Sequence, residues 1–226
     1  MSAQPTDSVP VDPASGLPGY IAIEGPIGVG KTTLAKRLAE SFGYPLLLEP
    51  STENPFLDRF YREGRRHALP TQLFFLLHRA QQIAQVRDDL LGSVLVADFL
   101  IEKDRLFAEL NLDENELELY DRIQDSLDLK PPSPDLVVYL QAPVSVLLRR
   151  IRQRGIGFEQ QMDANYLTAL CVAYTEFFHY YDQAPLLIVN AANVDFGNDQ
   201  HFDGLVERMA DMEGTRQYFN PDPTLL

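Results

Sequence analysis

Gly25-Pro-Ile-Gly-Val-Gly-Lys-Thr32 fits the phosphate-binding pattern G-x-x-x-x-G-K-S/T and comes directly after the apolar run Tyr20–Ile23. Small residues in such a loop let backbone N–H groups wrap around a polyphosphate, and the positive end of the following helix strengthens that site. The next stretch, Thr33-Leu-Ala-Lys-Arg-Leu-Ala-Glu40, has a helical pattern. Strand, loop and helix together predict a P-loop that binds a nucleoside triphosphate.

The last residues of this loop carry its chemistry. The Lys31 ammonium is expected to reach the outer phosphates, and the Thr32 hydroxyl is expected to ligate Mg²⁺. The predicted nucleotide-binding residues are Gly25, Pro26, Ile27, Gly28, Val29, Gly30, Lys31, Thr32 and Thr33.

Composition and charge exclude several classes of protein. The 226 residues, 45% of them hydrophobic, suffice for one α/β domain with its own core. Thirty-three acidic against nineteen basic residues give a net charge of -14. This charge argues against a nucleic-acid partner, because phosphate backbones require clustered cations. No stretch reaches the roughly twenty apolar residues of a membrane span, and no secretion signal precedes the domain, so a cytoplasmic protein is predicted.

Periodicity along the chain predicts the fold. Residues 1–18 contain four prolines and no periodic pattern, so we expect a disordered leader followed by a single domain over residues 19–226. Apolar runs suited to buried strands recur at Tyr20–Ile23, Pro45–Leu48, Val94–Ala97, Leu136–Leu140 and Leu186–Val189. Helical patterns occupy Thr71–Leu91, Glu102–Tyr120, Glu116–Leu127, Val144–Arg154 and Tyr166–Tyr181. The predicted class is an α/β fold of the P-loop kinase type, a five-stranded parallel sheet with helices on both faces.

Charged side chains follow several of these strands. In parallel sheets the strand C-termini share the edge where ligands bind, so Glu49 is placed to accept a proton or hold a hydroxyl. Asp98 ends the third strand, where P-loop proteins commonly hold magnesium. Arg150 and Arg154 are four residues apart on one helix face, in a lid segment near residues 150–162. That spacing predicts a joint clamp on transferring phosphates.

Taken in order, these features resemble the deoxynucleoside kinase family over residues 20 to about 210. The landmarks are the phosphate loop, Glu49-Pro50, Asn54-Pro-Phe-Leu-Asp-Arg-Phe-Tyr61, Gln72 with Arg79, Asp98 with Phe107-Ala108, Tyr139-Leu-Gln141, and Arg150-x-x-x-Arg154-Gly155 with Glu159 and Tyr166-Leu167. The resemblance implies ATP and Mg²⁺ as cofactors. It also implies a homodimer formed through the helices Thr71–Leu91 and Glu102–Tyr120.

The resemblance also implies roles for single residues. Glu49 corresponds to the base that takes the proton from the 5′-hydroxyl of a deoxyribonucleoside. Tyr61 and Glu159 correspond to the pair that binds the sugar 3′-hydroxyl. The implied base pocket consists of Gln72, Phe75, Arg79 and Asp104, in which the arginine and the aspartate tune base choice. The implied catalytic residues are Glu49, Lys31, Arg150 and Arg154.

The sequence departs from the family after the third strand. Asp98-Phe99-Leu100 stands where the family usually has Asp-Arg-Ser or Glu-Arg-Ser, and Ile156 replaces a further lid arginine. A well-placed donor of this kind contributes about a hundredfold to a thousandfold in rate. Either activity is slow or another cation takes the place of the arginine. The candidates are Lys103, Arg105, Arg62, Arg65 and Arg66, and the sequence leaves the choice among them open.

The function favoured at this point is transfer of the ATP γ-phosphoryl group to the 5′-hydroxyl of a deoxynucleoside, in nucleotide salvage. A purine deoxynucleoside or deoxycytidine is expected to be preferred over thymidine. One alternative is a weakened nucleotide-binding sensor or scaffold of kinase ancestry, which Phe99 and Ile156 support. The other is a nucleoside monophosphate kinase, although Glu49 would repel a phosphate dianion and suits a neutral hydroxyl.

Overall fold

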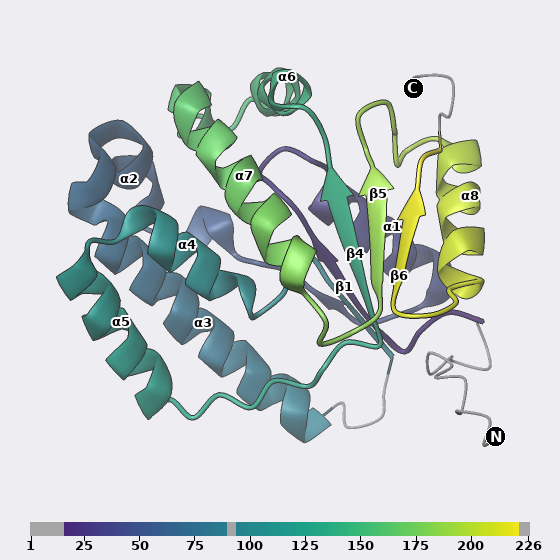
Figure 1. Ribbon diagram of the computed structural model, residues 1–226, viewed down its shortest axis with the longest axis horizontal. Coiled ribbons are helices and arrows are strands. Elements are labelled where there is room, and N and C mark those ends of the chain that lie inside the picture. The colour runs from purple at the N-terminus through teal and green to yellow at the C-terminus, as the bar shows by residue number, and fades with distance from the viewer. Residues whose placement is uncertain (1–15, 90–93, 222–226) are drawn as a thin grey trace.

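The apolar run before the phosphate loop forms β1 (Tyr20–Glu24), whose five residues are all buried between β3 (Leu95–Ala97) and β4 (Leu136–Gln141). The computed structural model describes residues 16–89 and 94–221 (Figure 1). The remaining strands of the described part are β2 (Leu46–Leu47), β5 (Leu186–Asn190) and β6 (Arg216–Phe219). They pair in the order β2-β3-β1-β4-β5-β6, and every pairing is parallel.

The predicted parallel α/β fold is confirmed, and the count of five strands is corrected to six. The strand that the pattern missed, β6, lies at the edge of the sheet and pairs only with β5. Its residues are half-buried or exposed, and Tyr218 is 70% exposed. An edge strand of this kind has no continuous apolar run, so the pattern used for buried strands does not detect it.

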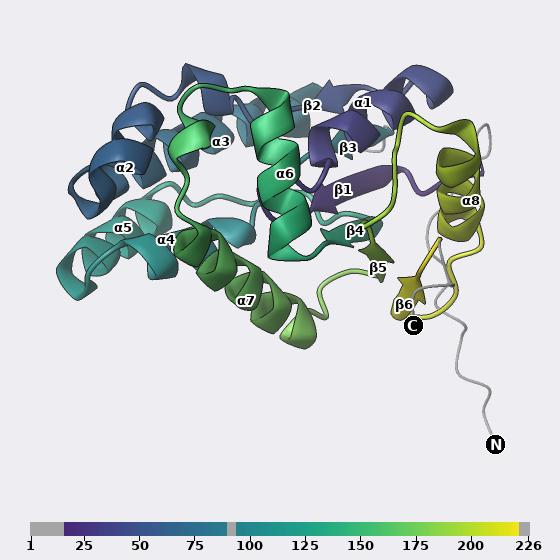
Figure 2. The ribbon, with the colours of Figure 1, turned by 90° about the horizontal axis from the view of Figure 1, so that it is seen from above.

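The helices connect and cover the strands. They are α1 (Lys31–Phe42), α2 (Leu57–Glu63), α3 (Ala68–Asp89), α4 (Lys103–Asn111), α5 (Glu114–Ser126), α6 (Val144–Arg154), α7 (Ala164–Tyr180) and α8 (Asp199–Ala210), with 3₁₀ turns η1 (Ser51–Glu53), η2 (Gly64–His67) and η3 (Glu159–Gln161). Figure 2 shows α1 and α7 on opposite sides of the sheet. Helices therefore cover both faces, as predicted.

The acidic helical stretch after β3 forms two helices, α4 and α5. Asp113 starts the second one, because its side chain accepts from the Glu116 backbone and the Glu116 side chain accepts from the Asp113 backbone. This reciprocal capping box fixes the break between the two overlapping predicted helices. The last predicted residues of Thr71–Leu91, 90 and 91, lie outside the described residues.

The core surrounds the sheet, and a second apolar cluster joins α2, α3, α4 and α5. Most of the expected leader, residues 1–15, lies outside the described residues, whereas Leu17 is 1% exposed and packs into the main core. Leu17, predicted to belong to the leader, thus packs with the domain.

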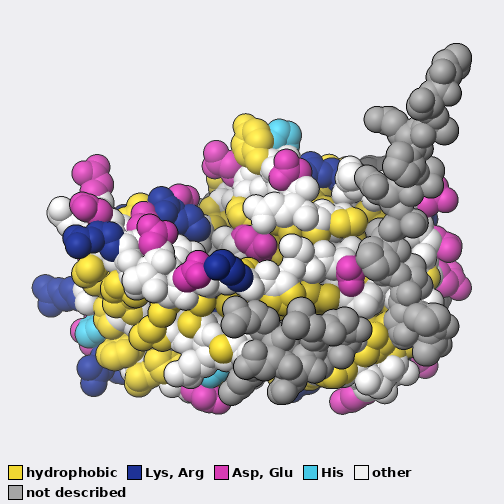
Figure 3. All heavy atoms as spheres, turned by 90° about the horizontal axis from the view of Figure 1, so that it is seen from below, with side chains coloured by type: hydrophobic (Ala, Val, Ile, Leu, Met, Phe, Trp, Pro, Cys, Tyr) yellow, Lys and Arg dark blue, Asp and Glu magenta, His cyan; other side chains and the backbone are white. Residues whose placement is uncertain are grey.

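On the face drawn in Figure 3, acidic side chains lie beside basic ones. Among the described helices, none has the length and hydropathy of a membrane span.

Candidate functional site

The phosphate loop needs its glycines for two different reasons. Gly25 has φ 148°, and a Cβ there would lie 2.3 Å from the carbonyl oxygen of Leu140 in the neighbouring strand. Gly30 has φ 113°, and its Cβ would lie 3.1 Å from the ring of Phe196. Residues with a Cβ rarely adopt either backbone conformation, and at Gly25 the neighbouring backbone leaves no space for a Cβ. The loop therefore keeps this conformation without strain only with glycine at these two positions.

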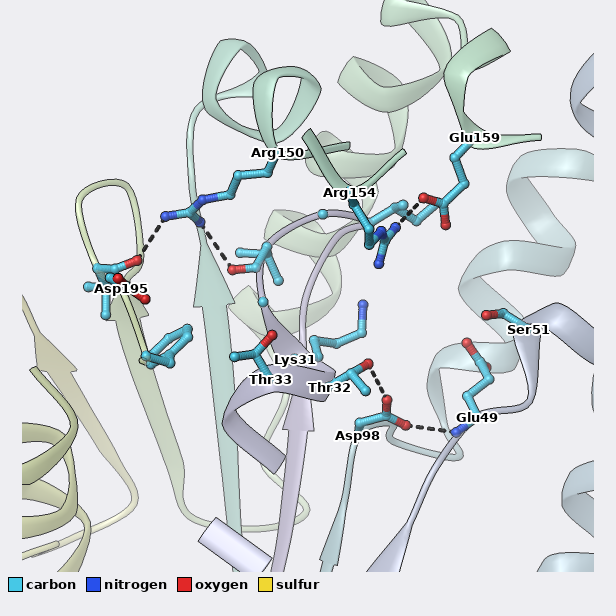
Figure 4. Close-up of a pocket in the computed structure, with 16 residues that line it drawn as sticks. Lys31, Thr32, Thr33, Glu49, Ser51, Asp98, Arg150, Arg154, Glu159 and Asp195 are labelled. Atoms are coloured by element: carbon cyan, nitrogen blue, oxygen red, sulfur yellow. Dashed lines mark hydrogen bonds and ion pairs between the residues drawn. The ribbon is translucent and has the colours of Figure 1, made fainter. Parts of the chain in front are cut away.

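Lys31 begins α1 and points into the pocket at the loop (Figure 4). Its Nζ donates to the Gly25 carbonyl at 2.6 Å, within the loop itself. Burial lowers the pKa of Lys31, while the carboxylates of Glu24, Glu49 and Asp98 act in the opposite direction. The ammonium is a compact donor directed at the place where outer phosphates would lie.

Thr32 and Asp98 bring two oxygens together below the loop. Thr32 Oγ1 donates to Asp98 Oδ2 at 2.6 Å, and the Glu49 backbone N–H donates to Asp98 Oδ1 at 2.7 Å (Figure 4). Burial raises the pKa of Asp98, and these two hydrogen bonds oppose the rise. Hydroxyl and carboxylate oxygens are the ligands that Mg²⁺ prefers, often with few protein ligands and several waters. The two side chains fit a magnesium site.

A cavity of about 380 Å³ runs from these residues to the loop after β5. Of the predicted nucleotide-binding residues, Ile27 to Thr33 line it, whereas Gly25 and Pro26 lie outside its lining. Glu49 and Glu159 line one end, and Asp195 and Phe196 line the other. The cavity thus has carboxylates at both ends and the phosphate loop in the middle.

Arg150 and Arg154, predicted as a joint clamp, both line the cavity but have different partners. Arg150 donates to backbone carbonyls, to Val29 at 3.1 Å, Ala191 at 2.8 Å and Val194 at 2.9 Å. Arg154 instead forms an ion pair with Glu159 (Figure 4). The spacing of four residues places both on one helix face, but the loop after β5 passes Arg150, whose guanidinium donates to carbonyls of that loop.

Glu49 lies within a cluster of charges. It forms an ion pair with Arg79, and Lys103 Nζ is 3.3 Å from its Oε1. Burial acts to raise the pKa of Glu49, but Lys103, Arg79 and Lys31 outweigh that effect and hold it at about 2. The carboxylate is therefore ionised and held at the end of the cavity.

The predicted base-pocket residues Arg79 and Asp104 form a buried ion pair, with Arg79 Nε donating to Asp104 Oδ2 at 2.7 Å. Burial raises the pKa of Asp104 to about 6, although Arg79 opposes the rise. The Arg79 guanidinium also lies 5.4 Å from the centre of the Phe75 ring. Gln72 is 4% exposed. Gln72, Arg79 and Asp104 are thus buried and Phe75 is half-buried, so neither Gln72 nor Asp104 lies on the surface.

The predicted sugar-binding residues come from two segments that meet. The Tyr61 ring stacks on that of Phe158, next to Glu159, with 6.0 Å between the ring centres. Burial raises the pKa of Tyr61 well above its usual range, and nearby Tyr166 and Glu159 add to the rise. Glu159 is 6% exposed and paired with Arg154. The phenol and the carboxylate are therefore brought to the same end of the site as Glu49.

Sequence reasoning assigned no role to two parts of this site. The loop with Asp195 and Phe196 follows β5 at the ligand-binding edge. Its position directly after a strand could have identified it as part of the site. Glu24, which ends β1, is fully buried and accepts hydrogen bonds from Gly25, Leu100 and Tyr174. The position of Glu24 at the end of a central strand, next to the phosphate loop, could likewise have identified it as a site residue.

Comparisons with known proteins agree on one family. The model of the deoxynucleoside kinase family matches residues 21–212. The chain is 40% identical over 157 residues to deoxyguanosine kinase of Bacillus subtilis (strain 168), covering 69% of this chain and 76% of that one. It is 30% identical over 190 residues to deoxyadenosine kinase of Lactobacillus acidophilus, covering 78% and 87%. A solved structure of deoxyadenosine kinase from M. mycoides with bound dATP superimposes with a TM-score of 0.73 at 25% identity, covering 84% and 97%.

Proposed function

The chain belongs to the deoxynucleoside kinase family. From this premise we propose that it transfers the γ-phosphoryl group of ATP to the 5′-hydroxyl of a purine deoxynucleoside, with deoxyguanosine as the preferred substrate. The family and the named relatives make the chain an ATP-dependent kinase of deoxynucleosides. The choice of deoxyguanosine follows the relative of 40% identity, a deoxyguanosine kinase. The sensor and the monophosphate kinase are not favoured by these relatives.

ATP would lie along the cavity with its phosphates on the loop Ile27–Lys31 and its base toward Asp195 and Phe196. Lys31 would neutralise the outer phosphates, and Thr32 and Asp98 would hold Mg²⁺, which neutralises charge on the phosphate oxygens when it is bound. Arg150 would hold the loop after β5 against the phosphate loop, since its hydrogen bonds join the two backbones. The phosphate clamp predicted for Arg150 stays a prediction beside this role.

Glu49 carries the proposal of a neutral acceptor. Its ionised carboxylate lines the cavity at the side of Asp98 and can take the proton of a hydroxyl that attacks the γ-phosphorus. A phosphate monoester at the same place would bring a dianion against this carboxylate. The position and charge of Glu49, at the end of the cavity beside Asp98, are the single observation on which the choice of a nucleoside acceptor rests.

The nucleoside would lie between Glu49 and the buried residues of α3 and α4. Tyr61 and Glu159 would bind the 3′-hydroxyl, and Phe75 would contact the face of the base. Gln72, Arg79 and Asp104 would bind the base edge, with Asp104 as an acceptor whose direction Arg79 fixes. Thymine offers a methyl group to such a polar pocket, which supports the expected preference against thymidine.

Arg154 would stabilise the charge of the transferring phosphoryl group, because it lines the cavity and is already held by Glu159. Together with Lys31 and Glu49 it completes the proposed catalytic set. A single domain, a homodimer through α3 and α4, a cytoplasmic location and a role in salvage stay predictions.

A substrate competition tests this proposal. The enzyme, with ATP and Mg²⁺, receives equal concentrations of deoxyguanosine, deoxyadenosine, deoxycytidine and thymidine, and the four monophosphates are quantified by chromatography during early turnover. Deoxyguanosine monophosphate is expected to form fastest and thymidine monophosphate slowest. Thymidine monophosphate as the leading product would refute the proposed pocket.

A further inference from the structure

Lys103, the first residue of α4, is a buried cation between two carboxylates. Its Nζ lies 3.3 Å from Glu49 Oε1 and 3.4 Å from Glu24 Oε2, and its side chain is 3% exposed. A lysine removed from water in this way is stable only when its charge is compensated. The two contacts therefore fix where the ammonium lies.

Glu24 is a rigid anchor for this lysine. Its Oε1 accepts from the Gly25 backbone and from the Tyr174 hydroxyl, both at 2.8 Å, and its Oε2 accepts from the Leu100 backbone at 2.8 Å. Fully buried and held by three donors, this carboxylate cannot turn. The ammonium of Lys103 is thereby held from the side of β1 and directed at Glu49.

Phe99 cannot supply a cation at this place. It is fully buried, and its ring centre lies 5.7 Å from the Arg79 guanidinium, inside the protein. Of the other basic residues considered from the sequence, Arg105 pairs with Glu109 and Asp121 and Arg62 pairs with Asp58, whereas Arg65 and Arg66 are exposed. Arg79 contacts Glu49 as well, but it is shared with Asp104 in the base pocket. Lys103 is the cation whose described contacts are to Glu24 and Glu49.

We propose that Lys103, anchored by Glu24, positions the Glu49 carboxylate for proton transfer and so takes the place of the arginine that Phe99 replaces. This inference rests on the proposed function of Glu49. Lys103 is a positioning residue, because it does not line the cavity of the phosphate loop in the described part of the chain. Its effect on the reaction passes through Glu49.

Replacement of Lys103 by methionine keeps the length of the side chain and removes its charge. We expect kcat to fall about a hundredfold, since a misplaced catalytic group costs about that much, while the Kd for ADP changes less than about threefold. Lys103→Arg restores the charge and should recover at least about tenfold of the lost kcat. Lys36→Met, at an exposed position of α1, is the matched control and should leave kcat unchanged.

A double-mutant cycle separates positioning from general destabilisation. In the Glu49→Gln background, adding Lys103→Met should lower the residual kcat by less than about threefold, because the group that Lys103 positions is already gone. A further hundredfold loss would overturn the proposal, as would parent-like kcat in Lys103→Met alone. Thermal unfolding and ADP binding check that each variant is folded. If the methionine variant does not fold, Lys103→Gln, which keeps a neutral donor, replaces it in the same cycle.

The experiments distinguish an error in this inference from an error in the proposed function. If the parent enzyme forms no deoxynucleoside monophosphate from ATP, the proposed function is wrong. If the parent is active and the losses simply multiply, only the role of Lys103 is wrong.

Discussion

Replacing Glu49 by glutamine removes the proposed proton acceptor and preserves the shape of its side chain. The amide oxygen can still accept from Arg79 and Lys103, which contact Glu49 Oε1 in the structure. The backbone N–H of residue 49 still donates to Asp98, so the proposed magnesium site is unchanged. The loss is thus confined to general-base catalysis. Such catalysis contributes about 10²–10⁴-fold, or about 2.7–5.5 kcal/mol of activation free energy.

We therefore expect the kcat of Glu49→Gln to fall at least about a hundredfold, with the Kd for ADP unchanged. The assay is ADP release at saturating ATP and deoxyguanosine, together with ADP binding by calorimetry. The matched control is Glu53→Gln, because Glu53 is an exposed carboxylate of η1 in the same segment. Its kcat should equal that of the parent. A Glu49→Gln variant that keeps a parent-like kcat would refute the reasoning.

Three further predictions follow from the geometry of the site. Removing the 3′-hydroxyl, as in 2′,3′-dideoxyguanosine, should lower kcat/KM about tenfold to a hundredfold, because Tyr61 and Glu159 lose their partner; equal values for both substrates would remove these residues from the sugar site. Lowering the pH from 7.5 to 5.5 should raise the KM for deoxyguanosine, since Asp104, with its pKa raised to about 6, takes up a proton. The KM of Asp104→Asn should not depend on pH in this range. If the KM of that variant still rises as in the parent, the assignment is contradicted. Because this pKa is above the usual value of 3.8, the folded state binds the proton more tightly than the unfolded state. Protonation of Asp104 therefore raises the free energy of unfolding as the pH falls from above 6 toward 4. Gly30→Ala should weaken ADP binding, because alanine rarely adopts a φ of 113° and its Cβ would lie 3.1 Å from the Phe196 ring. Gly43→Ala, with nothing within 4 Å of its Cβ, should bind ADP normally. Equal ADP affinities of the two variants would show that the loop tolerates the side chain.

Much of the fold follows from the sequence because buried parallel strands have continuous apolar runs. β1, β4 and β5 agree with the predicted runs to within one residue at each end. β6 was missed because its half-exposed residues lack such a run. The break between α4 and α5 depends on capping by Asp113, a local signal that helical periodicity alone does not resolve.

The candidate site was predicted to a similar extent. Strand ends and the phosphate loop located Glu49, Asp98 and Lys31, since parallel strands bring their C-termini to one edge. The direction of long side chains was not predictable: Arg150 turns toward the loop after β5, and Lys103 turns between two carboxylates. These directions depend on residues far away in the sequence, which spacing along a helix does not reveal.

Transfer of radiolabel tests the central claim most directly. The enzyme is incubated with [γ-³²P]ATP, Mg²⁺ and deoxyguanosine. The labelled nucleotide products are then separated and digested with a nucleotidase specific for 5′-monophosphates. The account predicts labelled deoxyguanosine 5′-monophosphate in equal amount to the ADP formed, and loss of the label from the nucleoside on digestion. ADP without labelled nucleoside, or label at the 3′-position, would contradict the assignment of Glu49 and its acceptor.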